Sequence, residues 1–379
     1  MLRTTFQPQY WAAVPFHFWS GVFFVFGSIV GSFLNVCIHR MPAGQSIISP
    51  PSHCPHCKYA IPWYLNIPLI TWLYLGGKCK NCGAPISIRY FLVELVTGLA
   101  FLACWLVFGR QSASLVLIYG MFLAGLIVAT FIDFEHFIIP DEITLGGMGV
   151  GLLCSWLVPG LQHQRSHLES LGASAIGLVF GAGLVYSILR LGKLVFGRQK
   201  LKLAQETRIV FGENAVQLPD REIAYEEVFY RPSDVIALRA RTVELVDRCY
   251  KDVLVRLGLS QKPPLLQIGE EKLNPEGVAY LEAVSEEIVL PREAMGLGDV
   301  KFMGAIGAFL GWQAVLFSLV VSSFIGALVG VGLVVMRKRA LSSRLPYGPY
   351  IAAAATIWMF AGRELVSWYG RFIGSIFAH

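Results

Sequence analysis

The chain has 379 residues, of which 55% are hydrophobic and 15% are charged, and its formal net charge is +6. A soluble domain carries roughly a quarter charged residues, and a disordered chain combines low hydrophobicity with high charge. The composition therefore excludes both classes and indicates a membrane protein. The basic excess requires no nucleic acid partner, because basic residues beside anionic membrane lipid account for it.

Apolar runs predict the membrane-spanning helices, since about 20 apolar residues are needed to cross the hydrocarbon core. Eight runs qualify, of which the sixth is short: 16–37, 91–108, 114–132, 143–159, 172–194, 300–312, 313–336 and 347–362. Two polar blocks, 38–90 and 198–295, separate them. We therefore expect an all-α polytopic membrane protein with a small cytoplasmic zinc-binding block and a cytoplasmic α+β insertion.

This interpretation divides the chain into five parts. They are residues 1–37 with the first transmembrane helix, the tetra-cysteine block 38–90, helices two to five in 91–197, the soluble insertion 198–295, and the last three helices with the C-terminal tail in 296–379. No cleavage pattern follows the first apolar run, so we expect a retained anchor and not a signal peptide.

Basic residues near the ends of the spans predict the orientation. The first polar block has no Asp or Glu and carries Arg40, Lys58, Lys78, Lys80 and Arg89. That block should face the cytoplasm, as should the basic loop 337–344. An even number of spans then places both termini in the periplasm.

Two Cys-x-x-Cys pairs in the first polar block form a candidate metal site, with Cys54, Cys57, Cys79 and Cys82 as ligands. Zinc prefers a tetrahedron of soft ligands, and the two pairs supply four thiolates. The alternative is two disulfides, which require an oxidising compartment. Because the block is predicted to face the cytosol, we expect a structural Zn²⁺, with His53 and His56 as solvated neighbours.

Two carboxylates lie at the ends of apolar runs, where the membrane makes a charge costly. Asp133 ends the third apolar run, and Asp299 directly precedes the sixth. Ionisable groups at such depths often mark a functional site. If both face one water molecule, like-charge repulsion lets the pair hold a single proton, which is the arrangement of an aspartyl protease.

The glycines beside Asp299 suit this role. Gly296 and Gly298 allow a positive φ and a close approach of substrate backbone, and a helix N-terminus suits Asp299 as the initial base. The alternative is that Asp299 only caps its helix and Asp133 belongs to a solvated loop.

Asp141 is expected to cap the fourth span. A transporter with a proton relay and a non-catalytic scaffold of secretion machinery are the rival functions.

Five motifs, in order along most of the chain, resemble those of type IV prepilin peptidases. They are Gly31–Val36 with His39 and Arg40, the cysteine pairs with Gly76-Gly77-Lys78, Ile132-Asp133 through Ile139-Pro140-Asp141, Gly296-Leu297-Gly298-Asp299, and Pro346-Tyr347-Gly348-Pro349-Tyr350.

The resemblance implies an aspartyl protease of the bacterial inner membrane, with Asp133 and Asp299 as the catalytic pair. Its substrates would be type IV prepilins or type II secretion pseudopilins, which lose a short basic leader at the cytoplasmic face. It also implies N-methylation of the new N-terminus by S-adenosylmethionine, with Gly77 and Lys78 in the segment associated with that activity.

The block 198–295 departs from the family, in which this connection is usually short. Its apolar spacing predicts an amphipathic helix that is capped by Pro232-Ser233 and runs from Val235 to Leu257. Four short runs predict strands: 209–211, 216–218, 265–268 and 288–290. The sequence identifies no partner for this insertion.

Overall fold

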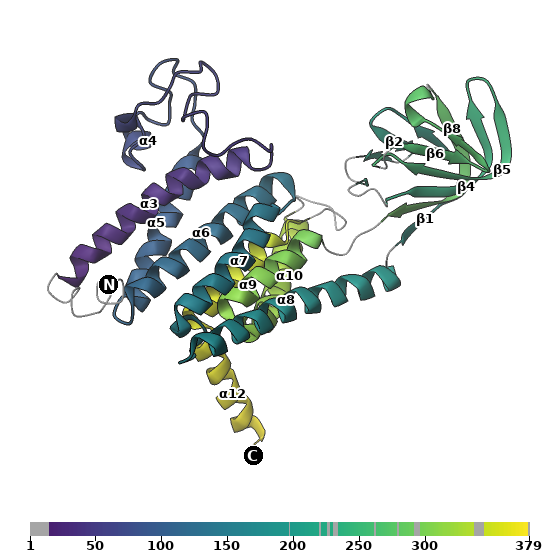
Figure 1. Ribbon diagram of the computed structural model, residues 1–379. Coiled ribbons are helices and arrows are strands. Elements are labelled where there is room, and N and C mark those ends of the chain that lie inside the picture. Colours follow the sequence, from purple (N-terminus) through teal and green to yellow (C-terminus); the bar gives the residue numbers. More distant parts are fainter. Residues whose placement is uncertain are drawn as a thin grey trace. The chain divides into compact units, whose positions relative to one another are not determined.

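The computed structural model describes residues 15–377, apart from gaps at 197, 220, 226–227, 230–233, 261–262, 279, 292–295 and 337–344. The basic loop 337–344 and the predicted cap Pro232-Ser233 lie outside the described residues. The chain forms two compact units, one of Met1–Tyr186 with Leu297–His379 and one of Ser187–Gly296 (Figure 1).

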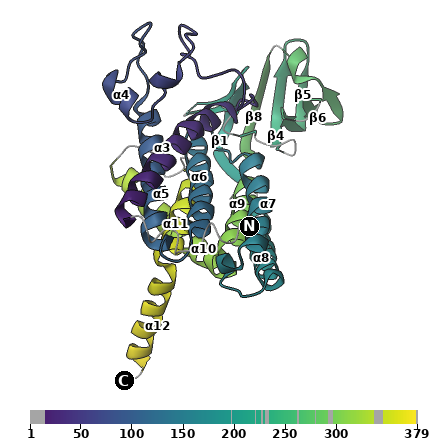
Figure 2. The same cartoon turned by 60° about the vertical axis from the view of Figure 1, so that its left-hand side comes forward.

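The first unit is helical. Its main helices are α3 (Phe16–Arg40), α5 (Ile88–Phe108), α6 (Ala113–His136), α7 (Asp141–Leu157), α8 (His167–Phe196, which continues into the second unit), α9 (Leu297–Leu310), α10 (Trp312–Val335), α11 (Gly348–Ile357) and α12 (Arg363–Phe377). A short helix α4 (Ile70–Tyr74) lies between α3 and α5 in the sequence. Figure 2 shows the long helices running alongside one another.

Five of these helices, α3, α5, α6, α8 and α10, are long and apolar enough to cross a membrane. The chain is therefore consistent with a polytopic membrane protein. Eight spans are not confirmed, because α7, α9 and α11 have 17, 14 and 10 residues. At 1.5 Å per residue, the 14 residues of α9 extend about 21 Å, which is shorter than a hydrocarbon core of about 30 Å.

Glycines allow α9 to pack closely against α8. A Cβ atom on Gly307 would lie 2.0 Å from the carbonyl oxygen of Gly177, and one on Gly177 would lie 2.1 Å from the carbonyl oxygen of Gly307. Small residues permit such approaches between helices in membranes. The position of α9, which carries Asp299, thus depends on these two glycines.

Gly307→Ala is expected to destabilise the helical unit, because backbone atoms must move to admit the methyl group. Overpacking of this kind costs about 1–3 kcal/mol. The midpoint of thermal unfolding in detergent should fall, whereas it should stay level or rise in Gly172→Ala on α8, where a Cβ meets nothing within 4 Å and alanine is the better helix former. Equal midpoints for the two variants would contradict the close packing.

Side-chain donors satisfy the carbonyl groups at the end of α9. The Ala308 oxygen accepts hydrogen bonds from Ser174 Oγ at 2.6 Å and from Gln162 Nε2 at 2.8 Å. Gly311 follows with a φ of 82° and separates α9 from α10. Because an unsatisfied carbonyl is costly in lipid, these donors stabilise the break between the two helices.

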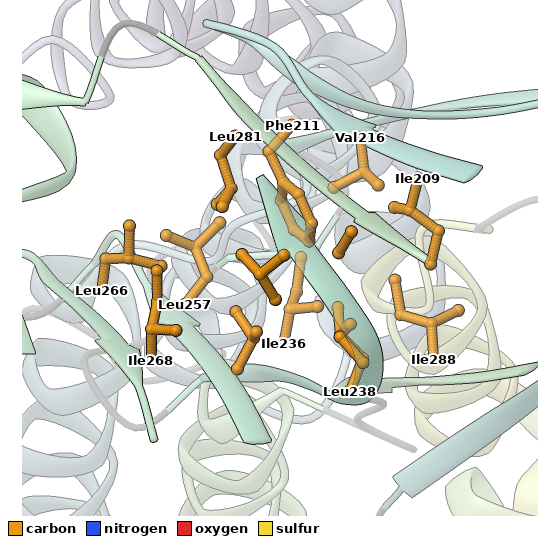
Figure 3. Close-up of a cluster of buried hydrophobic side chains, with 14 of the residues drawn as sticks. Ile209, Phe211, Val216, Ile236, Leu238, Leu257, Leu266, Ile268, Leu281 and Ile288 are labelled. Atoms are coloured by element: carbon orange, nitrogen blue, oxygen red, sulfur yellow. The ribbon is translucent and has the colours of Figure 1, made fainter. Parts of the chain in front are cut away.

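The described residues of the second unit form a single antiparallel sheet of eight strands with the order β3-β2-β1-β8-β4-β5-β6-β7. The strands are β1 (Arg198–Phe211), β2 (Ala215–Leu218), β3 (Arg221–Ala224), β4 (Ile236–Leu245), β5 (Cys249–Gly258), β6 (Leu265–Ile268), β7 (Glu271–Leu273) and β8 (Leu281–Pro291). Its core includes Ile209, Leu238, Leu257 and Ile288, which Figure 3 shows converging between the strands. The protein is therefore more than all-α.

The four predicted strands are present, but the helix predicted from Val235 to Leu257 is wrong. That segment is the hairpin of β4 and β5, in which Ile236 pairs with Leu257 and Glu244 with Cys249. The pairing of β4 with β8 shifts register around Ala240. This shift moves the buried positions from Leu238 and Ala240 to Val243, so the apolar spacing imitates that of a helix. In the described residues the insertion contains strands and a 3₁₀ turn, Pro275–Gly277, but no α-helix.

Candidate functional site

Asp133 lies in the last turn of α6, where the apolar run of that helix ends. It is 6% exposed, and its Oδ2 atom accepts a hydrogen bond of 2.8 Å from the backbone N–H of Gly348. Gly348 is the first residue of α11, so the N-terminus of that helix meets the carboxylate. A Cβ on Gly348 would lie 2.8 Å from Oδ2, which explains why glycine is needed there.

Asp299 lies in the first turn of α9 and is buried. Gly296 directly precedes this helix, and Gly298 belongs to its first turn. The positive φ expected for Gly298 is not found. Instead a Cβ on Gly298 would lie 3.4 Å from Cβ of Ile139, so the glycine allows α9 to begin close to the segment that follows α6.

Ile139 connects the surroundings of the two carboxylates. It is 8% exposed. It lies against Gly298, and its Cδ1 atom would be 3.1 Å from a Cβ on Gly348. The end of α6, the start of α9 and the start of α11 therefore meet around one side chain. Gly348 belongs to a motif that the sequence shows, but the sequence alone predicted no role for it.

Ion pairs surround this meeting point. Arg89 at the start of α5 pairs with Glu135 of α6. Lys301 of α9 donates to Oδ1 of Asp141 at 2.6 Å. Asp141 is the first residue of α7 and does not cap it, because Pro140 occupies the cap position and no side-chain cap bond is made. The predicted capping role of Asp141 is therefore wrong, and its carboxylate instead ties α7 to α9.

The four cysteines come together as the spacing predicted. Their sulfur atoms lie within 4.8 Å of one another, with 3.8 Å between Cys54 and Cys82 and 4.0 Å between Cys57 and Cys79. A tetrahedron with metal–sulfur bonds of about 2.3 Å has sulfur–sulfur distances of about 3.8 Å. The cluster fits one metal ion, and no pair is close enough for a disulfide bond, which needs about 2.05 Å. In the described residues, no histidine belongs to the group.

The two cysteine pairs fold alike. In the first, Lys58 N–H donates to the Cys54 oxygen at 2.9 Å, and in the second, Gly83 N–H donates to the Cys79 oxygen at 2.9 Å. Lys58 and Gly83 both have a positive φ. The side-chain amide of Asn81 donates to Cys57 Sγ and is the first cause that lowers the pKa of Cys57 to about 6. This thiol therefore favours the thiolate form that binds a metal.

Gly77 and Lys78 lie directly before the second cysteine pair. Gly77 has a φ of 67°, and a Cβ there would be 2.9 Å from the ring of Trp72. Lys78 forms an isolated bridge with Pro85. Both residues therefore belong to the fold of the block, and Gly77 lies against the indole ring.

Two family models match the chain. The model of the bacterial peptidase A24 N-terminal domain matches residues 25–108, and that of the type IV leader peptidase family matches residues 120–205 and 277–331. The first match contains all four cysteines. The second contains Asp133 and Asp299, and most of the β-sheet unit falls between its two parts.

Curated relatives agree with these matches. A prepilin leader peptidase/N-methyltransferase of Aeromonas hydrophila is 28% identical over 381 residues, which cover 94% of this chain and 95% of the relative. A type 4 prepilin-like proteins leader peptide-processing enzyme of Escherichia coli is 39% identical over 219 residues, covering 53% of this chain and 76% of the relative. No solved structure matches.

Proposed function

The chain belongs to the type IV leader peptidase family, and from that premise we propose that it is a membrane aspartyl endopeptidase. It removes the basic leader from type IV prepilins or type II secretion pseudopilins and methylates the new N-terminus. The observation that carries the peptidase assignment is the burial of Asp133 and Asp299 at helix ends that meet around Ile139.

Two carboxylates that share one proton are sufficient for peptide hydrolysis. The ionised group takes a proton from water, and the protonated group donates to the carbonyl oxygen of the scissile bond. Asp299, in the first turn of α9, is the initial base that takes the proton from water. The N–H of Gly348 fixes Oδ2 of Asp133, which leaves the protonated Oδ1 of Asp133 to donate to the substrate carbonyl. When the amine leaves, the group that took the proton from water gives it to the amine nitrogen, and the other group takes its proton back from the hydroxyl of the tetrahedral intermediate.

The topology follows the prediction from basic residues. We place the protein in the bacterial inner membrane, with both termini periplasmic and with the carboxylates and the cysteine block at the cytoplasmic face. A prepilin carries an apolar helix in the membrane and its leader on the cytoplasmic side, so the scissile bond would reach the end of α6. Membrane lipid is therefore the second partner, and the β-sheet unit has no assigned partner.

The cysteines hold a structural Zn²⁺ in this proposal, since four thiolates leave no open position for a water molecule. S-adenosylmethionine supplies the methyl group for the second activity. Gly77 and Lys78 support that activity from the block.

The test is incubation of the purified enzyme in detergent with a prepilin and S-adenosylmethionine, followed by mass measurement of the product. We expect loss of the leader mass and gain of one methyl group. An unchanged prepilin in the presence of correctly folded enzyme would exclude the peptidase, and a cleaved but unmethylated product would exclude the second activity. A scaffold or a transporter would leave the prepilin intact.

A further inference from the structure

The hydroxyl group of Tyr347 ties the start of α11 to α10. Its oxygen lies 2.9 Å from Oγ of Ser322 and 2.9 Å from Oγ of Ser323, both of which belong to α10. The two serine hydroxyls also lie 3.1 and 2.8 Å from the carbonyl oxygen of Leu319. Each hydroxyl can donate one hydrogen and accept others. The three hydrogens are therefore enough for both bonds to Tyr347 and one bond to Leu319.

Packing holds the same segment against α10. A Cβ on Gly326 would lie 3.2 Å from Cδ2 of Tyr350 and 3.8 Å from Cε2 of Tyr347. Gly326 follows Ser322 by one turn of the helix, so the two residues lie on the same face of α10. Pro346 and Tyr350 are buried. The start of α11 is therefore fixed on this face by the two tyrosine rings and by the hydroxyl bonds of Tyr347.

This contact reaches Asp133 through a single peptide group. Tyr347 directly precedes α11, and its carbonyl oxygen accepts hydrogen bonds from the N–H groups of Tyr350 at 3.1 Å and Ile351 at 3.2 Å. The N–H of Gly348 belongs to the same planar trans peptide group and points the opposite way. It donates to Oδ2 of Asp133 at 2.8 Å. The placement of the Tyr347 backbone therefore sets the direction of this N–H.

We propose that Tyr347 is a positioning residue for peptide hydrolysis, an inference that rests on the proposed function. Its hydroxyl, bound to the two serines of α10, aims the N–H of Gly348 at Oδ2 of Asp133. That bond keeps the proton of Asp133 on Oδ1, the oxygen that donates to the substrate carbonyl. Tyr347 takes no proton itself and acts through Gly348 and Asp133.

Tyr347→Phe removes the hydroxyl and keeps the ring. The kcat of leader cleavage should fall about tenfold, because a displacement of about 1 Å at a reacting group can cost about 100-fold. The KM should stay within about twofold, since only a transition-state interaction is weakened. Thr356→Val is the matched control on α11, because Thr356 Oγ1 donates to the Ala352 carbonyl oxygen of the same helix at 2.8 Å. Its kcat should be parental.

A double variant of the two serines tests whether they act through the tyrosine. Ser322→Ala with Ser323→Ala should lower kcat by the same factor as Tyr347→Phe. The triple variant should fall no further, because an interaction shared by the three groups is lost only once. Ser323→Ala alone, at an exposed position, should cause part of the loss and replaces the double variant if that protein fails to unfold cooperatively. Parental kcat in Tyr347→Phe, or multiplied losses in the triple variant, would overturn the proposal.

Nuclear magnetic resonance of the full-length protein in micelles observes the aimed N–H directly. Isotope labels on the carbonyl carbon of tyrosine and the nitrogen of glycine select three amides, those of Gly120, Gly348 and Gly370. The signal that moves in Asp133→Asn identifies Gly348. It should also move upfield in the serine double variant, because the amide proton loses a carboxylate acceptor that deshields it.

An unmoved Gly348 signal in the serine variant would overturn the proposal, because a role in helix packing alone lowers kcat without releasing this N–H. The measurement requires no turnover and is therefore independent of the peptidase assignment. A parent that cleaves no prepilin, beside a signal that moves as expected, would refute the peptidase and leave the placement of Gly348 by Tyr347 standing.

Discussion

Replacing Asp133 or Asp299 with Asn is expected to reduce leader cleavage at least about 100-fold, because each variant removes one partner in proton transfer. The Asp133→Asn side chain keeps an oxygen that can accept the N–H of Gly348, now 2.8 Å from Asp133 Oδ2. The surrounding helices should therefore keep their positions. The initial rate of prepilin cleavage by purified proteins in micelles measures the effect, with thermal unfolding as the check on folding.

Asp141→Asn is the matched control for both variants. Its carboxylate lies near the start of α9 through the ion pair with Lys301, and its side chain is 58% exposed. Exposed ion pairs contribute about 0–1 kcal/mol, so cleavage should stay near the parental rate. Substantial cleavage by either Asp133→Asn or Asp299→Asn, beside an active control, would disprove the catalytic pair.

The sequence predicted those parts of the candidate site whose residues follow a local pattern. Two Cys-x-x-Cys pairs predict a tetrahedral cluster because each pair turns tightly and needs only one long-range encounter. An acidic residue at the end of an apolar run, as at Asp133, is conspicuous because the membrane penalises it. Such signals depend on composition and spacing, and the folded cluster of sulfur atoms agrees with the first of them.

Contacts between distant segments could not be predicted from the sequence. The hydrogen bond from Gly348 N–H to Asp133 Oδ2 joins residues 215 positions apart, and the close approach of Gly177 to Gly307 is evident only when α8 packs against α9. In the β-sheet unit, the register shift near Ala240 disturbed the alternation that identifies a strand. The eight predicted spans are not confirmed, because helices such as α7, with 17 residues, fall short of the about 20 residues that a crossing needs.

Removal of the metal should separate the two proposed activities. Between residues 41 and 87 the buried residues are Cys54, Gly77 and Cys79, so the block has no apolar core of its own. Structural zinc contributes about 10–16 kcal/mol of apparent binding free energy in zinc-finger peptides, and in the proposed site it would take the place of that core. Without it, the block should lose its fold, including the segment that carries Gly77 and Lys78.

Cys79→Ser, or treatment with a chelator, is therefore expected to abolish methyl transfer while most leader cleavage remains. The two aspartates are positioned by α6, α9 and α11. The buried residues of these helices belong to the helical unit and not to the cysteine block. Elemental analysis should give one zinc per parental chain and also in Cys249→Ser, which changes an exposed cysteine of the β-sheet unit. Full zinc content in Cys79→Ser would refute the metal site. Equal loss of cleavage and methylation would show that the block also supports the aspartates, because helix packing alone would then be insufficient to hold them.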